Sequence, residues 1–134
     1  MMRVFLGLLV MLTMVTAAVG AEAIAAGTYK GTYEGSAGSA GDIRVVLAKS
    51  GEGAWTGEAA FWLGGQEVKC KVTSVKVDGS KLRMVYTFDL QGNALESMIE
   101  GEFSEGKLAG KYRTQVAGEG STVDEGTWSG KNGS

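Results

Sequence analysis

The side chains that could do chemistry in this chain are mostly hydroxyls and carboxylates, since its 134 residues include no histidine and one cysteine, Cys70. These counts exclude a histidine-based catalytic triad, an imidazole metal site, a CxxC redox pair and a thiolate zinc site. Because the usual general bases and nucleophiles are missing, we expect no enzymatic activity, no cofactor and no metal. Cys70 lies between Val68 and Val72, a position that favours a buried, inert thiol over a reactive one.

Two groups of carboxylates remain as candidates for chemistry. Glu96, Glu100 and Glu102 fall on one face of an alternating segment, whereas calcium sites draw their oxygens from a loop. We therefore interpret them as a solvated strand face. Asp124 and Glu125 have no carboxylate partner that the sequence places across a cleft, so a glycosidase pair is unsupported.

The elements that must position these groups are short strands. A large apolar residue, one spacer and a glycine recur at 29–31, 33–35, 55–57, 62–64, 99–101, 108–110 and 128–130. Each copy lies in a stretch where apolar and polar residues alternate. Glycine within such a stretch marks a bend, a bulge or a close approach of two backbones.

The alternation predicts about eight strands, near residues 27–35, 43–47, 55–63, 67–77, 81–90, 95–103, 107–116 and 122–130. The apolar parity shifts near Ser74, which predicts a β-bulge there. Most connections are short enough for hairpins, and Gly64-Gly65 suits a two-residue turn. We therefore predict an all-β, antiparallel up-and-down meander that forms a closed or nearly closed barrel, with an open two-layer sandwich as the alternative.

The two faces of the predicted strands differ in polarity, and this difference indicates which face points into the barrel and whether the outer face meets water or lipid. One face carries the aromatic residues, and the other carries residues such as Lys107, Lys111 and Arg113. Basic residues facing lipid would be costly, so we expect the aromatic face inside and no insertion into a membrane. Trp62 falls on the outer face, where it is either a docking anchor for a partner protein or a residue covered by the 36–40 connection.

The first residues have the features of an export signal. Arg3 precedes an uncharged apolar run from Val4 to Val19, and small residues flank Ala21 and Ala23. This pattern predicts a signal peptide over residues 1–21 and a secreted or periplasmic domain over 22–134; the alternative is an uncleaved membrane anchor. With 13 basic and 15 acidic residues in the chain, we expect no nucleic-acid partner.

The layout from Gly27 to Gly130 resembles the secreted lipocalin-like (calycin-type) small β-barrel domains of bacteria. The resemblance rests on Gly27-Thr28-Tyr29, on the segment 75–82 and on Gly126-Thr127-Trp128. The chain departs from true lipocalins in having a tyrosine at the Gly-x-Trp position, no disulfide, no C-terminal helix and a shorter length. The resemblance implies a barrel that binds a small molecule or a partner, and it carries no catalytic residues.

The function depends on whether the interior is hollow, because an eight-stranded barrel either fills with side chains or holds one small ligand. A hollow barrel would bind a small apolar molecule with one or two polar groups. The predicted walls are Trp55, Phe61, Phe88 and Trp128, and the predicted polar contacts are Tyr33, Tyr86 and Tyr112. The tyrosines could instead cap the barrel or bond to backbone. A filled barrel would be a structural or protein-interaction module, contacting an envelope protein through Trp62.

Overall fold

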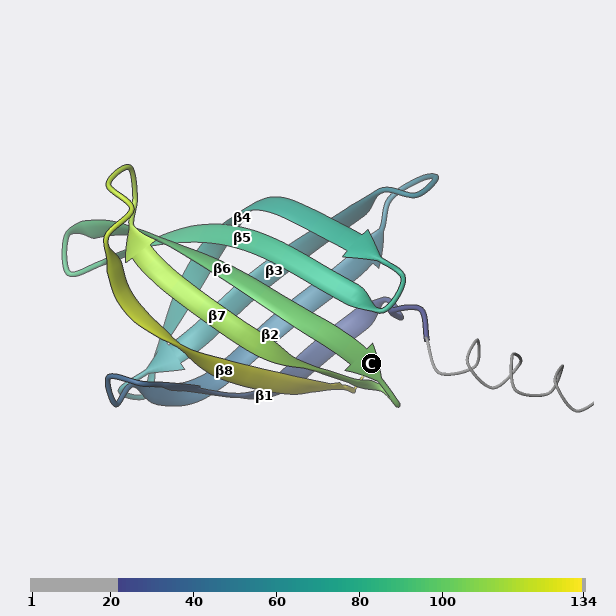
Figure 1. The fold of residues 1–134 in the computed structure, drawn as a ribbon, viewed down its shortest axis with the longest axis horizontal. Helices are drawn as coiled ribbons and strands as arrows, with labels where there is room; N and C mark the ends of the chain where they lie inside the picture. The colour runs from purple at the N-terminus through teal and green to yellow at the C-terminus, as the bar shows by residue number, and fades with distance from the viewer. Residues whose placement is uncertain (1–21, 134) are drawn as a thin grey trace, which may run out of the picture.

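The computed structural model describes residues 22–133, so the predicted signal peptide lies outside the described residues. The described chain folds into eight strands and no helix (Figure 1). These are β1 (Gly27–Gly35), β2 (Ala40–Lys49), β3 (Trp55–Leu63), β4 (Gln66–Asp78), β5 (Lys81–Leu90), β6 (Asn93–Ser104), β7 (Lys107–Val116) and β8 (Thr122–Asn132).

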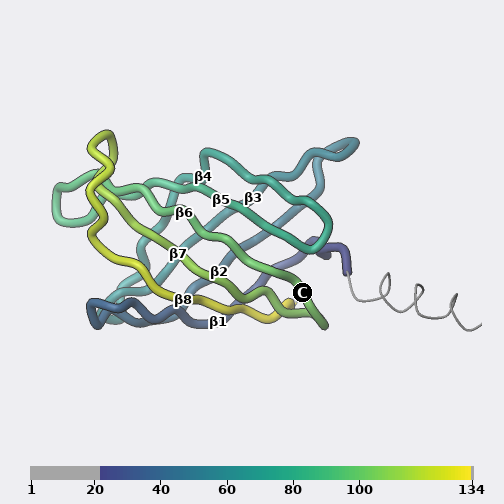
Figure 2. The backbone as a smooth tube through the Cα atoms, viewed as in Figure 1, coloured from purple at the N-terminus to yellow at the C-terminus, as the bar shows by residue number. Residues whose placement is uncertain are grey.

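Each strand pairs antiparallel with the next along the chain, and β8 returns to pair with β1, which closes the barrel. At the β1–β8 seam, Gly31 lies opposite Gly130 and Tyr33 lies opposite Trp128. The strands run obliquely to the long axis of the molecule (Figure 2), as closure of a sheet into a barrel requires. The predicted antiparallel meander and its closure are confirmed, and the open sandwich is not formed.

Four strand glycines, Gly31, Gly41, Gly110 and Gly126, sit where two backbones approach closely. A Cβ atom on Gly31 would overlap the carbonyl of Ser129 on β8, and one on Gly110 would overlap the carbonyl of Glu100 on β6. Gly126 is placed in the same way against Glu34 of β1. These positions lack side chains because the tightly coiled sheet leaves no room for them.

Two bulges adjust the pairing. The register between β4 and β5 shifts between Val72 and Ser74, which confirms the bulge predicted near Ser74. A second shift lies between Thr114 and Gln115 of β7. Here Thr114 pairs with Asp124 while Gln115 pairs with Thr122, so the intervening residue of β8 drops out of the ladder.

One half of the barrel interior is filled with side chains. The residues exposed by 1% or less are Tyr29, Val45, Leu47, Met84, Ile99 and Leu108. They lie towards the end of the barrel that carries the β2–β3, β4–β5 and β6–β7 connections, on the right of Figure 1. Trp128 adds to this half, packing over Gly101 and donating its indole N–H to the carbonyl of Glu100 at 3.0 Å.

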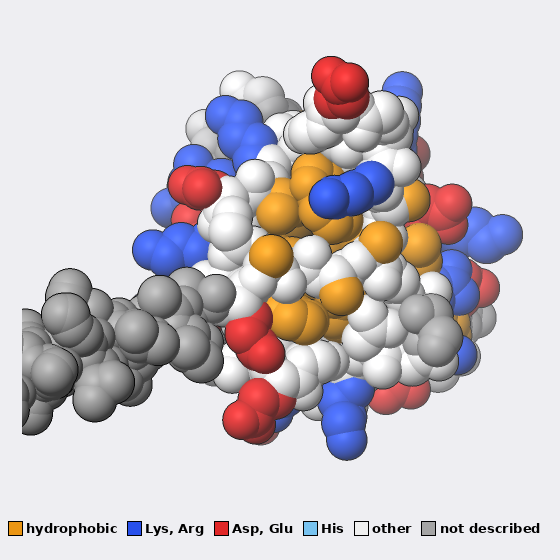
Figure 3. Space-filling view, turned by 90° about the vertical axis from the view of Figure 1, so that its right-hand side faces the viewer, with side chains coloured by type: hydrophobic (Ala, Val, Ile, Leu, Met, Phe, Trp, Pro, Cys, Tyr) orange, Lys and Arg blue, Asp and Glu red, His pale blue; other side chains and the backbone are white. Residues whose placement is uncertain are grey.

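The segment before β1 crosses this filled end. Ile24 is buried, and its backbone N–H donates to the carbonyl of Gly79 at 3.0 Å. The Tyr29 hydroxyl donates to the carbonyl of Ala25 at 2.5 Å. Figure 3 looks at this end, where hydrophobic side chains gather in the centre among charged ones. Residues 22–26 therefore belong to the folded domain.

Candidate functional site

The other half of the barrel is hollow. A cavity of about 510 Å³ lies towards the end that carries the β1–β2, β3–β4, β5–β6 and β7–β8 connections. Its wall is formed mainly by apolar residues: Ile43, Phe61, Leu63, Phe88, Leu90, Leu95 and Val116. Ala37, Gln91, Asn93 and Val123 line the rim and are exposed, so the cavity is reached from solvent.

Aromatic rings pack edge to face around the cavity. The ring centroids of Phe61 and Phe88 lie 4.9 Å apart, and those of Tyr33 and Phe61 lie 5.8 Å apart. Tyr33 also meets Tyr112, at 5.9 Å and an interplanar angle of 88°. Such edge-to-face pairs hold each other in place, so this part of the wall is preformed.

Four polar residues form a row around the cavity wall, one on each of the strands β5 to β8. Tyr86 of β5 lies opposite Ser97 of β6, Ser97 lies opposite Thr114 of β7, and Thr114 lies opposite Asp124 of β8. We call these four residues the polar row. The hydroxyl oxygens of Ser97 and Thr114 are 2.5 Å apart, and Tyr86 is hydrogen-bonded to Ser97. All four line the cavity.

Asp124 is the one charged residue in the cavity lining. Its Oδ2 accepts hydrogen bonds from the Ser39 hydroxyl at 2.6 Å and from the Tyr112 hydroxyl at 2.8 Å. Its Oδ1 is buried and has no hydrogen-bond partner. A Cβ on Gly35 would come within 2.5 Å of that oxygen, so the missing side chain at this position makes room for the carboxylate.

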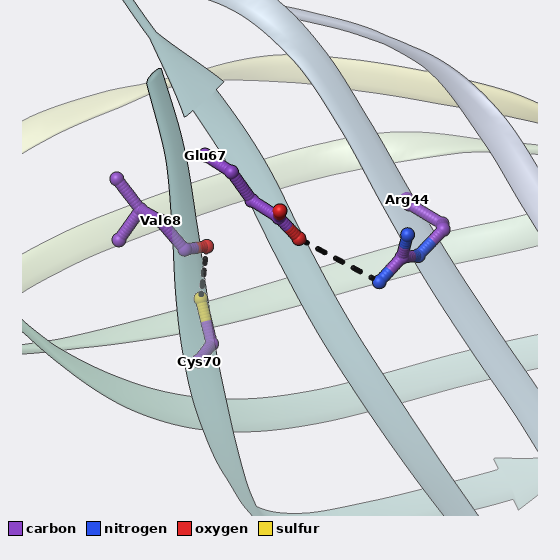
Figure 4. A network of polar contacts seen from close by, with 4 residues as sticks. All are labelled: Arg44, Glu67, Val68 and Cys70. Carbon is purple, nitrogen blue, oxygen red and sulfur yellow. Dashed lines mark hydrogen bonds and ion pairs between the residues drawn. The ribbon is translucent and has the colours of Figure 1, made fainter.

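No cation compensates Asp124 within the described chain. The ion pairs of residues 22–133 are Arg44–Glu67 at 3.9 Å and Arg83–Glu100 at 3.2 Å, and neither includes it. Figure 4 shows the first of these pairs joining β2 and β4. The carboxylate is therefore held by two hydroxyl donors alone.

The tyrosines of the cavity stay neutral. Burial raises the pKa of Tyr86, and burial together with the hydrogen bond to Asp124 raises the pKa of Tyr112. Burial also raises the pKa of Tyr33, with smaller contributions from the charges of Asp124 and Asp42. Each phenol is thus a hydrogen-bond donor over the physiological pH range.

The tyrosine hydroxyls have two kinds of partner. Tyr33 donates to the backbone carbonyl of Trp62 at 2.8 Å, as in the backbone-bonding alternative. Tyr86 and Tyr112 are instead bonded to the side chains of Ser97 and Asp124. They therefore belong to the polar side of the cavity.

The structure brings five of the seven predicted ligand contacts together: Tyr33, Phe61, Tyr86, Phe88 and Tyr112 all line the cavity. Trp55 lies at the far end of β3, with the Lys49 ammonium 5.5 Å from its ring centroid. Trp128 packs in the filled half. Neither tryptophan is among the residues that line the cavity.

Trp62 and Cys70 are not among the residues that line the cavity. The guanidinium carbon of Arg44 is 5.8 Å from the centroid of the Trp62 ring, so a neighbouring strand partly covers this residue. The Cys70 sulfur lies 3.7 Å from the carbonyl oxygen of Val68 (Figure 4). Burial raises the pKa of Cys70 to about 12, so the thiol is protonated at neutral pH.

The sequence prediction missed the polar residues Ser39, Ser97, Thr114 and Asp124. Three of them could have been found from parity. Ser97 has the same parity as the inward residues Leu95 and Ile99. Thr114 has the same parity as Tyr112 and Val116. Asp124 likewise shares the parity of Gly126 and Trp128 on its strand. Ser39 lies in a connection, where no alternation indicates which way it points.

Compared with family models, curated proteins and solved structures, the chain matches none of them. The described residues contain no helix long and apolar enough to cross a membrane. Nor does the part of the chain described here bring three or more potential ligands together in a group that could hold a metal ion. The class of protein is thus defined by its fold, a closed eight-stranded antiparallel barrel compatible with lipocalin-like domains.

Proposed function

We propose that this protein is an exported, non-catalytic, lipocalin-like barrel that binds one small apolar molecule in the cavity. The observation that carries the proposal is the cavity of about 510 Å³, whose lining combines aromatic and aliphatic residues with the polar row. Ligand sites usually combine a mostly apolar lining with a few oriented polar groups, in volumes of roughly 300–1,000 Å³.

The distribution of side chains supports a binding role over a purely structural one. Large buried residues occupy one half of the barrel, which shows that side chains of this size can fill the interior of an eight-stranded barrel. Leaving a large apolar space open to solvent forfeits packing contacts and stability. A ligand that occupies this space would restore those contacts.

The proposed location follows from the first residues of the chain. The charged start, the short apolar run and the small residues near Ala21 support export and cleavage, which would release residues 22–134 outside the cytoplasm. The layout of Gly27-Thr28-Tyr29 and Gly126-Thr127-Trp128 supports the lipocalin-like assignment. The ligand would then be met in the periplasm or outside the cell.

Native mass spectrometry of the protein purified from its own source tests this function. We expect the mass of the processed chain with a small molecule bound, and release of that molecule on unfolding. A chain that carries no small molecule but holds a stoichiometric protein partner, lost in Trp62→Ala, would overturn the proposal in favour of an interaction module.

A further inference from the structure

Asp124 is the charged residue of the cavity lining. Resting on the proposed function, we propose that the ligand carries a cationic nitrogen, as in an alkyl- or arylalkylamine, which pairs with the Asp124 carboxylate while the apolar body lies against Phe61 and Phe88. This step narrows the ligand from any small apolar molecule to a cationic amphiphile.

The first argument is charge balance. Asp124 is a half-buried carboxylate whose Oδ1 is withdrawn from solvent, and charged groups removed from water in proteins are normally paired. Asp124 lies in the cavity lining without a lysine or arginine beside it, and the described ion pairs do not include it. A ligand cation would supply the missing counter-charge.

The second argument is unused hydrogen-bonding capacity. A carboxylate offers about four acceptor sites on its two oxygens, and the Ser39 and Tyr112 hydroxyls both donate to Oδ2. Oδ1 has no partner. An ammonium group has three donors and no acceptor, so it matches the part of the carboxylate that the protein leaves unsatisfied.

Oδ1 is buried beside Gly35, so the carboxylate must turn to meet a ligand. The torsion between Cβ and the carboxyl carbon is broad in aspartate, and rotation about it leaves the backbone in place. Ser39 lies in the connection between β1 and β2, at the rim. The turn therefore disturbs the hydrogen bonds that the Ser39 and Tyr112 hydroxyls donate to Oδ2, and it leaves Phe61 and Phe88 in place.

The remaining polar groups do not compete for this role. The hydroxyls of Ser97 and Thr114 bond to each other, and Tyr86 bonds to Ser97. Because these groups are satisfied within the protein and carry no charge, they fix no charge preference of their own. An anionic amphiphile, by contrast, would bring a second negative charge beside Asp124 with no cation to offset it.

Displacement of a neutral fluorescent probe, N-phenyl-1-naphthylamine, by three amphiphiles with the same tail tests the proposal at neutral pH. The competitors are decylamine, 1-decanol and decanoate, each kept below the concentration at which it forms micelles. We expect decylamine to displace the probe at a concentration about ten-fold lower than 1-decanol, as a charge-assisted hydrogen bond allows, with decanoate the weakest.

Asp124→Asn should remove the advantage of decylamine over 1-decanol, with both competitors measured against the variant's own affinity for the probe. The matched control is Asp89→Asn, which makes the same charge change at an exposed residue of β5 that does not line the cavity. This control should keep the preference for decylamine.

A second variant covers the case in which Asp124→Asn fails to fold. Ser39→Ala removes one donor from Oδ2 and leaves the carboxylate less compensated, so the ratio of decylamine affinity to 1-decanol affinity should rise above that of the wild type. Probe binding with equal displacement by decylamine and 1-decanol would overturn the charge preference and leave the proposed function standing. Failure of the probe and of all three amphiphiles to bind would overturn both.

Discussion

Cys70 illustrates how the environment of the barrel wall lowers the reactivity of a single thiol. Its inward parity between Val68 and Val72 predicted a buried, inert thiol; the structure leaves the residue half-buried, and this partial burial raises its pKa to about 12. Reaction with a disulfide reagent needs the thiolate, and few molecules of the folded protein carry it at neutral pH.

We therefore expect Cys70 to react with 5,5′-dithiobis(2-nitrobenzoate) at least about ten-fold more slowly in the folded protein than in the guanidinium-unfolded chain, near pH 8. The absorbance of the released thionitrobenzoate measures both rates. Equal rates would contradict the burial assigned to this sulfur.

Asp124 shows what sequence reasoning can and cannot find at the scale of one residue. Alternation places it on the inner face with Trp128, so its presence inside the barrel was predictable. Its two hydroxyl donors were not, because Ser39 is 85 residues away in sequence and comes from a connection. Contacts between distant segments depend on register across the seam, which the local pattern does not contain.

At the scale of the strands, the glycines let two backbones approach. Gly31 and Gly130 are register partners across the β1–β8 seam, but the room available for a Cβ atom differs between them. A Cβ on Gly31 would overlap the carbonyl of Ser129, whereas the nearest atom to a Cβ on Gly130 is 3.3 Å away. The two positions offer a matched test of whether the close approach of β1 to β8 at the seam requires glycine at position 31.

Gly31→Ala should lower the free energy of unfolding by about 1–3 kcal/mol, because the backbone at the seam must move to accept the methyl group. Gly130→Ala should cost less than about 1 kcal/mol, since its contacts are milder and alanine restricts the unfolded chain. Urea unfolding followed by tryptophan fluorescence measures both. Equal losses would show that seam geometry is not the reason for glycine at position 31.

The two bulges mark the limit of prediction at this scale. The bulge near Ser74 was predicted because Val72 and Val75 could not otherwise face the same side. The bulge opposite Thr114 and Gln115 left no such trace. The start of β8 carries few apolar residues, so a shift of one residue there moves no hydrophobic side chain that a pattern would reveal.

At the scale of the molecule, the barrel is filled at one end and hollow at the other. Alternation predicted which residues point inward, and the closed meander followed from short connections. It could not predict the cavity, because free volume depends on how side chains from all eight strands share each layer of the interior. The positions of Trp55 and Trp128 along their strands, not their parity, keep both out of the cavity lining.

Fluorescence titration with N-phenyl-1-naphthylamine tests the central claim, that the hollow half of the barrel binds a small apolar molecule. We expect saturable binding at one site per chain, with the blue-shifted emission of an apolar environment. Leu90→Trp, which adds bulk to the cavity wall, should weaken binding at least about ten-fold. Asp89→Trp adds the same side chain at the exposed neighbour and should bind as the wild type does. Absence of saturable binding in the folded wild-type protein, or equal binding by both variants, would contradict the account.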